Sequence, residues 1–170
     1  MTLAELNSLE RAEFVARLEF LFEDSPWVAE RAWARRPFDS WEALHRAMAD
    51  EVARAGVAEQ LALLRAHPDL GARAKMSQAS IGEQAGAGLD RLEPEERDLL
   101  ERRNTAYREK FGFPFLYAVK GSTRHAILEA LAQRLEAAPE DEFQEALRQV
   151  YRIAWFRIES RMERLAAEGD

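Results

Sequence analysis

A histidine next to a proline is the first candidate for acid–base chemistry in the sequence. His67 lies in the segment Ala66-His67-Pro68-Asp69-Leu70. Proline disfavours helical backbone at the residue before it, so we expect His67 at the end of a helix. An imidazole in that position can titrate near neutral pH and move a proton. The alternative is a histidine that only caps a helix or lies on the surface, and the segment alone leaves both open.

Polar side chains among small residues form a second candidate. Ser80, Glu83 and Gln84 bring a hydroxyl, a carboxylate and an amide close together in the sequence. These groups suit hydrogen bonds to a polar, planar molecule, and the small residues around them let a ligand approach the backbone. Because helical periodicity is lost, we expect a loop or broken helix over residues 77–90, and an ordinary solvated loop is the alternative. The glycines of this segment are Gly82, Gly86 and Gly88.

Aromatic residues gather in the segment Lys110-Phe111-Gly112-Phe113-Pro114-Phe115. So much aromatic surface in irregular backbone either fills the core or forms the wall of a pocket. The residues by themselves leave that choice open.

One cation near the C-terminal end has apolar neighbours. Arg157 lies in the segment Ile153-Ala154-Trp155-Phe156-Arg157-Ile158. A buried guanidinium needs an anionic partner. That partner is either a carboxylate of the protein, in a structural ion pair, or an anionic group of a ligand, and the sequence leaves both open.

Helices must position these candidates. Apolar residues recur at spacings of three and four along nearly the whole chain, which favours helix almost throughout. We predict an all-α fold, a bundle of seven to nine helices in a single domain over residues 1–170. The expected helices begin after a cap at Asn7 or Ser8, at Trp27, at Asp39 or Ser40, at Val57, at Glu93, at Ser122 or Thr123 and at Pro139, while residues 113–119 are expected to be extended or irregular.

The composition excludes several classes of site. The chain has 170 residues, no cysteine, 31 acidic and 24 basic side chains, and a formal net charge of −7. Without cysteine there is no disulfide, thiolate zinc site, iron–sulfur cluster or cysteine nucleophile. No histidine lies three or four residues from another, so we expect no metal site.

Charge and hydropathy also limit the partners. An acidic chain without a basic run is poorly suited to nucleic acid. The apolar segment 115–119 is far shorter than the roughly 20 residues of a membrane helix. The N-terminal segment Met1-Thr2-Leu3-Ala4-Glu5 lacks the layout of a signal peptide. We therefore expect a cytoplasmic protein that binds neither nucleic acid nor a membrane.

Several segments, in this order and spacing, resemble the 2-oxo-4-hydroxy-4-carboxy-5-ureidoimidazoline (OHCU) decarboxylase family of uric acid degradation. The resemblance extends from the region of Asn7 to the end of the last expected helix. The segments that carry it are His67-Pro68-Asp69-Leu70, the Ser80/Glu83/Gln84 pattern before Ala87-Gly88-Leu89, Asn104 and Tyr107 before residues 110–115, Val119-Lys120-Gly121, and Ile153-Ala154 before Arg157-Ile158.

The resemblance implies an all-helical carboxy-lyase, often a homodimer, that uses neither a metal nor an organic cofactor. Its substrate would be the small molecule OHCU and its product (S)-allantoin. Among the catalytic residues, His67 would transfer a proton, Glu83 would orient the imidazole or a ring N–H, and Arg157 would face the anionic end of the substrate. The residues implied to bind the substrate are Pro68, Ser80, Ile81, Gly82 and Gln84 and, through backbone groups, Phe115, Leu116, Tyr117, Ala118 and Val119.

Two further functions stay open. A non-catalytic helical module that binds a small molecule on the same scaffold would tolerate replacement of both His67 and Glu83. A decarboxylase that acts on a related ureido-imidazoline is the other. Tyr117 is bulkier than the small or aliphatic residue expected at its position, and a change of substrate preference would be made there. Gly82 is a second departure from the family pattern, because it loosens its turn.

Overall fold

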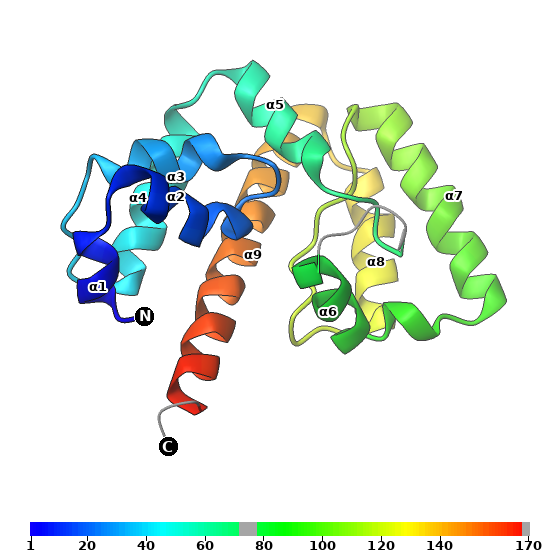
Figure 1. Cartoon of the computed structure of the whole chain (residues 1–170). Coiled ribbons are helices and arrows are strands. Elements are labelled where there is room, and N and C mark those ends of the chain that lie inside the picture. Colours follow the sequence, from blue (N-terminus) through cyan, green and yellow to red (C-terminus); the bar gives the residue numbers. More distant parts are fainter. Residues whose placement is uncertain (72–77, 168–170) are drawn as a thin grey trace. The chain divides into compact units, whose positions relative to one another are not determined.

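The computed structural model of the protein describes the backbone of residues 1–71 and 78–167 and the side chains of residues 1–71 and 81–164. All regular secondary structure in these ranges is helical, with nine α-helices and short 3₁₀ turns (Figure 1). The predicted all-α fold of seven to nine helices is confirmed. Every helix in the described ranges is too short or too polar to cross a lipid bilayer.

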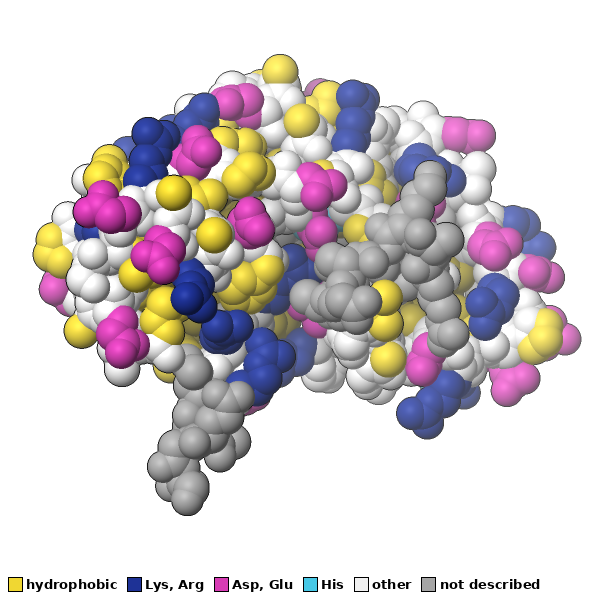
Figure 2. Space-filling view, viewed as in Figure 1, with side chains coloured by type: hydrophobic (Ala, Val, Ile, Leu, Met, Phe, Trp, Pro, Cys, Tyr) yellow, Lys and Arg dark blue, Asp and Glu magenta, His cyan; other side chains and the backbone are white. Residues whose placement is uncertain are grey.

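The chain forms two compact units. One contains residues 1–63 and the chain from Ala154 onward, and the other contains Leu64–Ile153. The division into two units does not test the prediction of a single domain over residues 1–170, which stays a prediction. In the described part of each unit, acidic and basic side chains are interspersed over the face in Figure 2.

The first unit is built from short helices packed in sequence order. The helix α2 packs against α3, and α3 packs against α4. Phe14, Leu44 and Val52 are fully buried in this unit. Its elements are α1 (Leu3–Ser8), α2 (Arg11–Leu18), η1 (Glu19–Leu21), α3 (Pro26–Trp33), α4 (Trp41–Arg54), the first part of α5 (Val57–Ala66) and the later part of α9 (Pro139–Ala167).

The predicted helix cap at Asn7 or Ser8 is wrong. The helix expected after this cap is α2, whose N-cap is Glu10, without a side-chain hydrogen bond. Asn7 and Ser8 belong to the preceding helix α1, which Thr2 caps in a capping box with Glu5. The side chain of Asn7 makes two hydrogen bonds to the backbone of Phe38, each 2.9 Å long. An asparagine side chain can cap a helix or bind the backbone of a distant residue, and at Asn7 it binds the distant Phe38 backbone. The predicted cap at Ser40 is confirmed, because its hydroxyl accepts a hydrogen bond from the Ala43 N–H at 3.0 Å.

The second unit carries most of the predicted site residues. Glu93 and Glu96 form a capping box at the start of α7, and Gly112 ends that helix with a φ of +81°, a conformation that glycine adopts without strain. Thr123 caps α8 as predicted. The elements are the end of α5, α6 (Gln78–Gly86), η3 (Leu89–Arg91), α7 (Pro94–Phe111), α8 (Arg124–Leu135) and the first part of α9.

Of the two alternatives predicted for residues 77–90, a loop or a broken helix, the described part is a broken helix. Residues 78–86 form the helix α6, and a 3₁₀ turn follows at Leu89–Arg91. Residue 77 lies outside the described residues. A glycine in a helix costs only about 1 kcal/mol relative to alanine, so the glycines lower the local preference without forbidding the helix. Gly88, with a φ of +81°, is the residue that turns the chain after α6.

Residues 113–119 are irregular, as predicted, and almost entirely buried. No regular element is assigned to this described segment. Phe115 has no exposed surface, and Leu116, Ala118 and Val119 are also buried. A buried stretch without a helix or sheet ladder must find other partners for its backbone polar groups. For Leu116 and Ala118 those partners are side chains, as the site shows.

Candidate functional site

His67 is the first residue beyond α5. The helix ends at Ala66, and the His67 N–H donates to the Leu64 carbonyl at 3.3 Å. The helix-end position predicted from Pro68 is therefore confirmed. The His67 residue is only 7% exposed, so it is not the surface histidine of the alternative reading. Pro68 beside it is half-buried.

The segment after His67 is held by contacts to two helices. The Gly71 N–H donates to Gln84 Oε1 of α6 at 2.8 Å. The Leu70 carbonyl accepts from Asn104 Nδ2 of α7 at 3.0 Å. Gly71 has a φ of +83°, and a Cβ there would lie 3.0 Å from a methyl group of Leu100. The backbone at Leu70 and Gly71, shortly after the histidine, is thus held by α6 and by α7.

Asp69 adds a charged contact to this arrangement. Its carboxylate lies 3.4 Å from the Arg108 guanidinium of α7. Arg108 is exposed, so the pair adds little stability. Its effect is to align the segment with α7.

The helix α6 places three predicted polar residues on one face. Ser80, Glu83 and Gln84 are spaced i, i+3 and i+4, which puts them side by side on a helix. Gln84 is buried and Glu83 is half-buried. The Ser80 side chain lies outside the described residues. The hydrogen bond from Gly71 to Gln84 brings this face to the segment that follows His67.

Ile81 and Gly82 belong to the other side of α6. Ile81 is 38% exposed, and a Cβ added to Gly82 would meet no atom within 4 Å. Their predicted contacts with substrate stay predictions. Glycine at position 82 leaves that face of the helix open.

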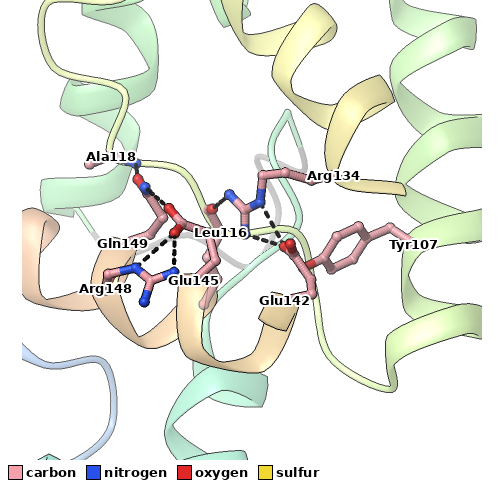
Figure 3. A network of polar contacts seen from close by, with 8 residues as sticks. All are labelled: Tyr107, Leu116, Ala118, Arg134, Glu142, Glu145, Arg148 and Gln149. Carbon is pink, nitrogen blue, oxygen red and sulfur yellow. Dashed lines mark hydrogen bonds and ion pairs between the residues drawn. The ribbon is translucent and has the colours of Figure 1, made fainter. Parts of the chain in front are cut away.

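The buried segment 115–119 is bound by side chains from α8 and α9. The Ala118 N–H donates to Gln149 Oε1 at 2.9 Å, and Arg134 Nη1 donates to the Leu116 carbonyl (Figure 3). The sequence analysis missed both Gln149 and Arg134. In the sequence each is only a polar residue on an amphipathic helix, which is common on any half-buried face.

Arg134 is itself held by a buried carboxylate. Its Nε donates to Glu142 Oε1 at 2.6 Å, and its Cζ lies 4.6 Å from the centre of the Phe115 ring. Glu142 is 1% exposed and also accepts a hydrogen bond from the Tyr107 hydroxyl. Burial, together with this hydrogen bond, raises the pKa of Tyr107. The phenol therefore stays protonated and continues to donate.

The aromatic residues around Tyr107 fill the core of the second unit. The rings of Phe111, Phe113 and Phe115 lie 4.6, 5.9 and 5.5 Å from the Tyr107 ring, measured between centroids. Phe113 and Phe115 are buried. Of the two readings of this segment, core packing is what the structure shows for these rings.

Arg157 has protein partners within the first unit. Its Nη1 donates to the Phe20 carbonyl and its Nη2 to Glu23 Oε1, each at 2.9 Å. The arginine is 4% exposed. This is the structural ion pair that the sequence analysis left open. The predicted contact of Arg157 with an anionic substrate stays a prediction.

A pocket of about 280 Å³ lies beside the start of the site, between residues 69–71 and α7. Asn104 lines it, and Asn104 Oδ1 is buried without a hydrogen-bond partner among the described residues. Among the predicted site residues whose side chains the structure describes, none lines this pocket.

Comparisons with known proteins identify relatives over nearly the whole chain. A family model described as OHCU decarboxylase matches residues 7–159. The chain is 45% identical over 159 residues to a 2-oxo-4-hydroxy-4-carboxy-5-ureidoimidazoline decarboxylase of Halalkalicoccus jeotgali, covering 94% of this chain and 90% of the relative. It is also 45% identical to a uric acid degradation bifunctional protein of Bacillus subtilis, covering 92% of this chain and 32% of that longer protein.

Two crystal structures share the fold. One, of an (S)-allantoin synthase, has a TM-score of 0.76 and 34% identity, and the match covers 94% of this chain and 53% of that one. The chain thus spans about half the length of that structure. The other, of an OHCU decarboxylase in the presence of (S)-allantoin, has a TM-score of 0.69 and 26% identity, covering 83% of this chain and 93% of the other.

Proposed function

The chain belongs to the OHCU decarboxylase family of uric acid degradation, and we propose that it is the carboxy-lyase that converts OHCU to (S)-allantoin. The observation that carries the proposal is the family match over residues 7–159. The placement of His67 and Gln84 supports it, because the histidine is buried at a helix end and the glutamine binds the backbone four residues after it.

The substrate can accept the electrons of its own decarboxylation. Its ring carries a carbon–nitrogen double bond next to the carboxylated carbon. When the bond to the carboxylate breaks and CO2 leaves, the electron pair forms a double bond between the two ring carbons, and the imine nitrogen takes up a proton. Most decarboxylases need a cofactor as an electron sink. Here the protein must orient the substrate, place charges and control proton transfer.

His67 is proposed to manage the second proton transfer. The enol left after CO2 loss gives up its hydroxyl proton, and the neighbouring ring carbon takes up a proton, which makes the carbonyl group and the stereocentre of allantoin. Delivery of that proton to one face gives the S enantiomer. Glu83 is proposed to orient the imidazole or a ring N–H. A relay of this kind contributes about 10²–10⁴-fold in rate.

Gln84 is proposed to act in two directions. Its Oε1 accepts from the Gly71 N–H, so its Nε2 group is turned away from that contact and suits a carbonyl oxygen of the ring or the ureido group. Ser80, on the same face of α6, is proposed to hold the ureido group as well. Pro68, Ile81 and Gly82 are proposed to complete this side of the site.

Arg157 is proposed to face the anionic end of the substrate. A guanidinium has five N–H donors in a planar fork, and the two contacts to Phe20 and Glu23 fix its orientation. A structural ion pair and a contact with the substrate are thus compatible for Arg157, since the protein can hold the guanidinium in the orientation that binds the substrate carboxylate. We also propose a homodimer and a cytoplasmic location, both on the family resemblance.

A stereochemical assay tests the function directly. OHCU is generated from urate by enzymatic oxidation and hydrolysis, this protein is added, and optical activity is followed. We expect fast appearance of (S)-allantoin. Formation of racemic allantoin at the rate of spontaneous decay would refute the proposal. Ligand binding without any acceleration would instead support the non-catalytic small-molecule module.

A further inference from the structure

We propose that Gln149 is a positioning residue for this reaction: by holding the Ala118 N–H it fixes which edge of the segment 115–119 faces the substrate. The inference rests on the proposed function and on a contact of the backbone groups of residues 115–119 with OHCU, which the family resemblance implies. It concerns a residue that touches the segment from α9 and has no proposed contact with the substrate itself (Figure 3).

The segment has two edges, and the protein binds one of them. In extended backbone, the polar groups of residues i and i+2 point to one edge and those of residue i+1 to the other. Leu116 and Ala118, two residues apart, are the ones bound by Arg134 and Gln149. The rings of Phe115 and Tyr117 stack 6.1 Å apart at 28°, which is the arrangement of i and i+2 side chains in an extended chain.

On the other edge, the main-chain groups of Phe115 and Tyr117 have no partner in the described structure, whereas the Val119 carbonyl accepts from the Ser122 N–H at 2.9 Å. Among the residues that the structure describes, no hydrogen bond reaches the main-chain groups of Phe115 or Tyr117, although Phe115 is fully buried. Buried backbone groups are nearly always paired. The edge opposite to Gln149 is therefore the one with donors and acceptors left for a ligand.

The orientation of the Gln149 amide is fixed by its neighbours. Its Nε2 donates to Glu145 Oε1 at 2.8 Å, and Glu145 Oε2 accepts from Arg148 Nε at 2.8 Å. An ionised carboxylate can only accept hydrogen bonds, so the NH2 group must face Glu145 and the amide oxygen must face Ala118. Although partial burial opposes it, the hydrogen bonds from Gln149 and Arg148 hold the pKa of Glu145 below its ordinary value.

Arg134 holds the same edge from α8. It binds the Leu116 carbonyl, and the buried Glu142 fixes its guanidinium. Two side chains from two helices thus hold neighbouring groups of one edge. A shift of the segment by one residue would exchange the two edges and break both contacts.

The first test replaces Gln149 with methionine, which keeps the length of the side chain and removes the strong acceptor. We expect KM for OHCU to rise about tenfold with a smaller change in kcat, because the segment contacts the bound substrate through its backbone. Gln144→Met is the matched control, an exposed glutamine on the same helix. Both variants are checked by circular dichroism and thermal unfolding, so that kinetics are compared between folded proteins.

The second test restores the contact with the partners exchanged. In the double variant Gln149→Glu/Glu145→Gln, the carboxylate introduced at position 149 accepts from the Ala118 N–H. The amide introduced at position 145 donates to that carboxylate. We expect KM to return to within roughly threefold of the wild-type value. A merely structural role would be visible in the unfolding temperature of Gln149→Met without a change in KM.

The outcomes separate the inference from the function it rests on. Wild-type protein that forms (S)-allantoin, together with an unchanged KM in folded Gln149→Met, would overturn the positioning role alone. A raised KM in Gln149→Met that the double variant fails to lower would also overturn it. Wild-type protein without decarboxylase activity would overturn the proposed function itself.

Discussion

The side-chain oxygen of Gln84 lies 2.8 Å from the backbone nitrogen of Gly71 and accepts its hydrogen bond. This single contact joins the helix α6 to the segment that starts at His67. It also turns a residue expected only to bind substrate into one that holds the backbone beside the proposed proton-transfer group. Changes at Gln84 should therefore affect both stability and catalysis, and the two effects can be separated.

Gln84→Glu should separate them. The carboxylate can still accept from the Gly71 N–H but can no longer donate to a substrate carbonyl. We expect an unfolding temperature close to that of the wild type and a loss in kcat/KM of about tenfold or more. Gln84→Leu removes both contacts and should lower stability by about 1–3 kcal/mol as well, because the Gly71 N–H is left unpaired. Equal kcat/KM in Gln84→Glu and the wild type would assign Gln84 a purely structural role.

His67→Asn tests the proton relay. Asparagine keeps a polar side chain of similar size but cannot transfer a proton near neutral pH. We expect a folded protein with a similar KM and a kcat lowered by about 10²–10⁴-fold, measured in the stereochemical assay. The control is His125→Asn, at an exposed position in α8. Near-normal turnover in His67→Asn would show that the histidine is not the proton-transfer residue.

Local signals predicted much of the fold. Ser40, Thr123 and the Glu93–Pro94 pair marked helix starts because a cap binds a backbone group only two or three residues away. Gly112 ends α7 for a similar local reason, because glycine adopts the positive φ of a helix C-cap without strain. His67 could be placed at a helix end because Pro68 acts on the residue directly before it.

The errors and omissions come from partners far along the chain. The Asn7 side chain binds Phe38, 31 residues away, and a cap was the only role visible locally. Gln149 and Ala118 are also 31 residues apart, and a glutamine on an amphipathic helix does not differ from a surface residue in the sequence. For residues 77–90 the sequence leaves a loop and a broken helix open because glycine lowers helix preference, and the contact of Gln84 with Gly71 cannot be seen in a local stretch of sequence.

The raised pKa of Tyr107 predicts that the protein loses stability in alkaline solution. Burial and the hydrogen bond to Glu142 raise its pKa in the folded protein above the ordinary value of 10.0. A raised folded pKa gives stability that is fully present below the unfolded pKa and is lost as the pH rises through the folded pKa. We therefore expect the unfolding free energy of the wild type to fall above about pH 10 more steeply than that of Tyr107→Phe.

Denaturant unfolding of both proteins between pH 7 and 11 measures this difference. At pH 7, Tyr107→Phe should be less stable by about 1–2 kcal/mol, because Glu142 loses one hydrogen bond. The gap should then narrow above pH 10. A gap that stays constant over the whole range would show that the phenol has the same pKa in the folded and unfolded states. Tyr117→Phe, at a half-buried tyrosine, serves as the control.

Arg157 and Glu23 allow the structural and the substrate-binding roles of the guanidinium to be distinguished. Glu23→Gln keeps a hydrogen-bond acceptor for Arg157 Nη2 but removes the opposite charge, so it should lower stability while leaving kcat/KM nearly unchanged. Arg157→Met removes the guanidinium from its buried ion pair with Glu23 and should cost about 3–5 kcal/mol of stability. If the guanidinium also binds the anionic end of the substrate, as proposed, kcat/KM of the folded variant should fall about 10–100-fold.

Steady-state kinetics at a temperature well below the unfolding transition of each variant decide between the two roles. Arg157→Lys adds a further comparison, since lysine keeps the charge but not the planar fork that binds a carboxylate with two hydrogen bonds. Partial activity in Arg157→Lys with none in Arg157→Met would assign the effect to charge at the substrate. Normal kinetics in both variants, with lowered unfolding temperatures, would make Arg157 a purely structural residue.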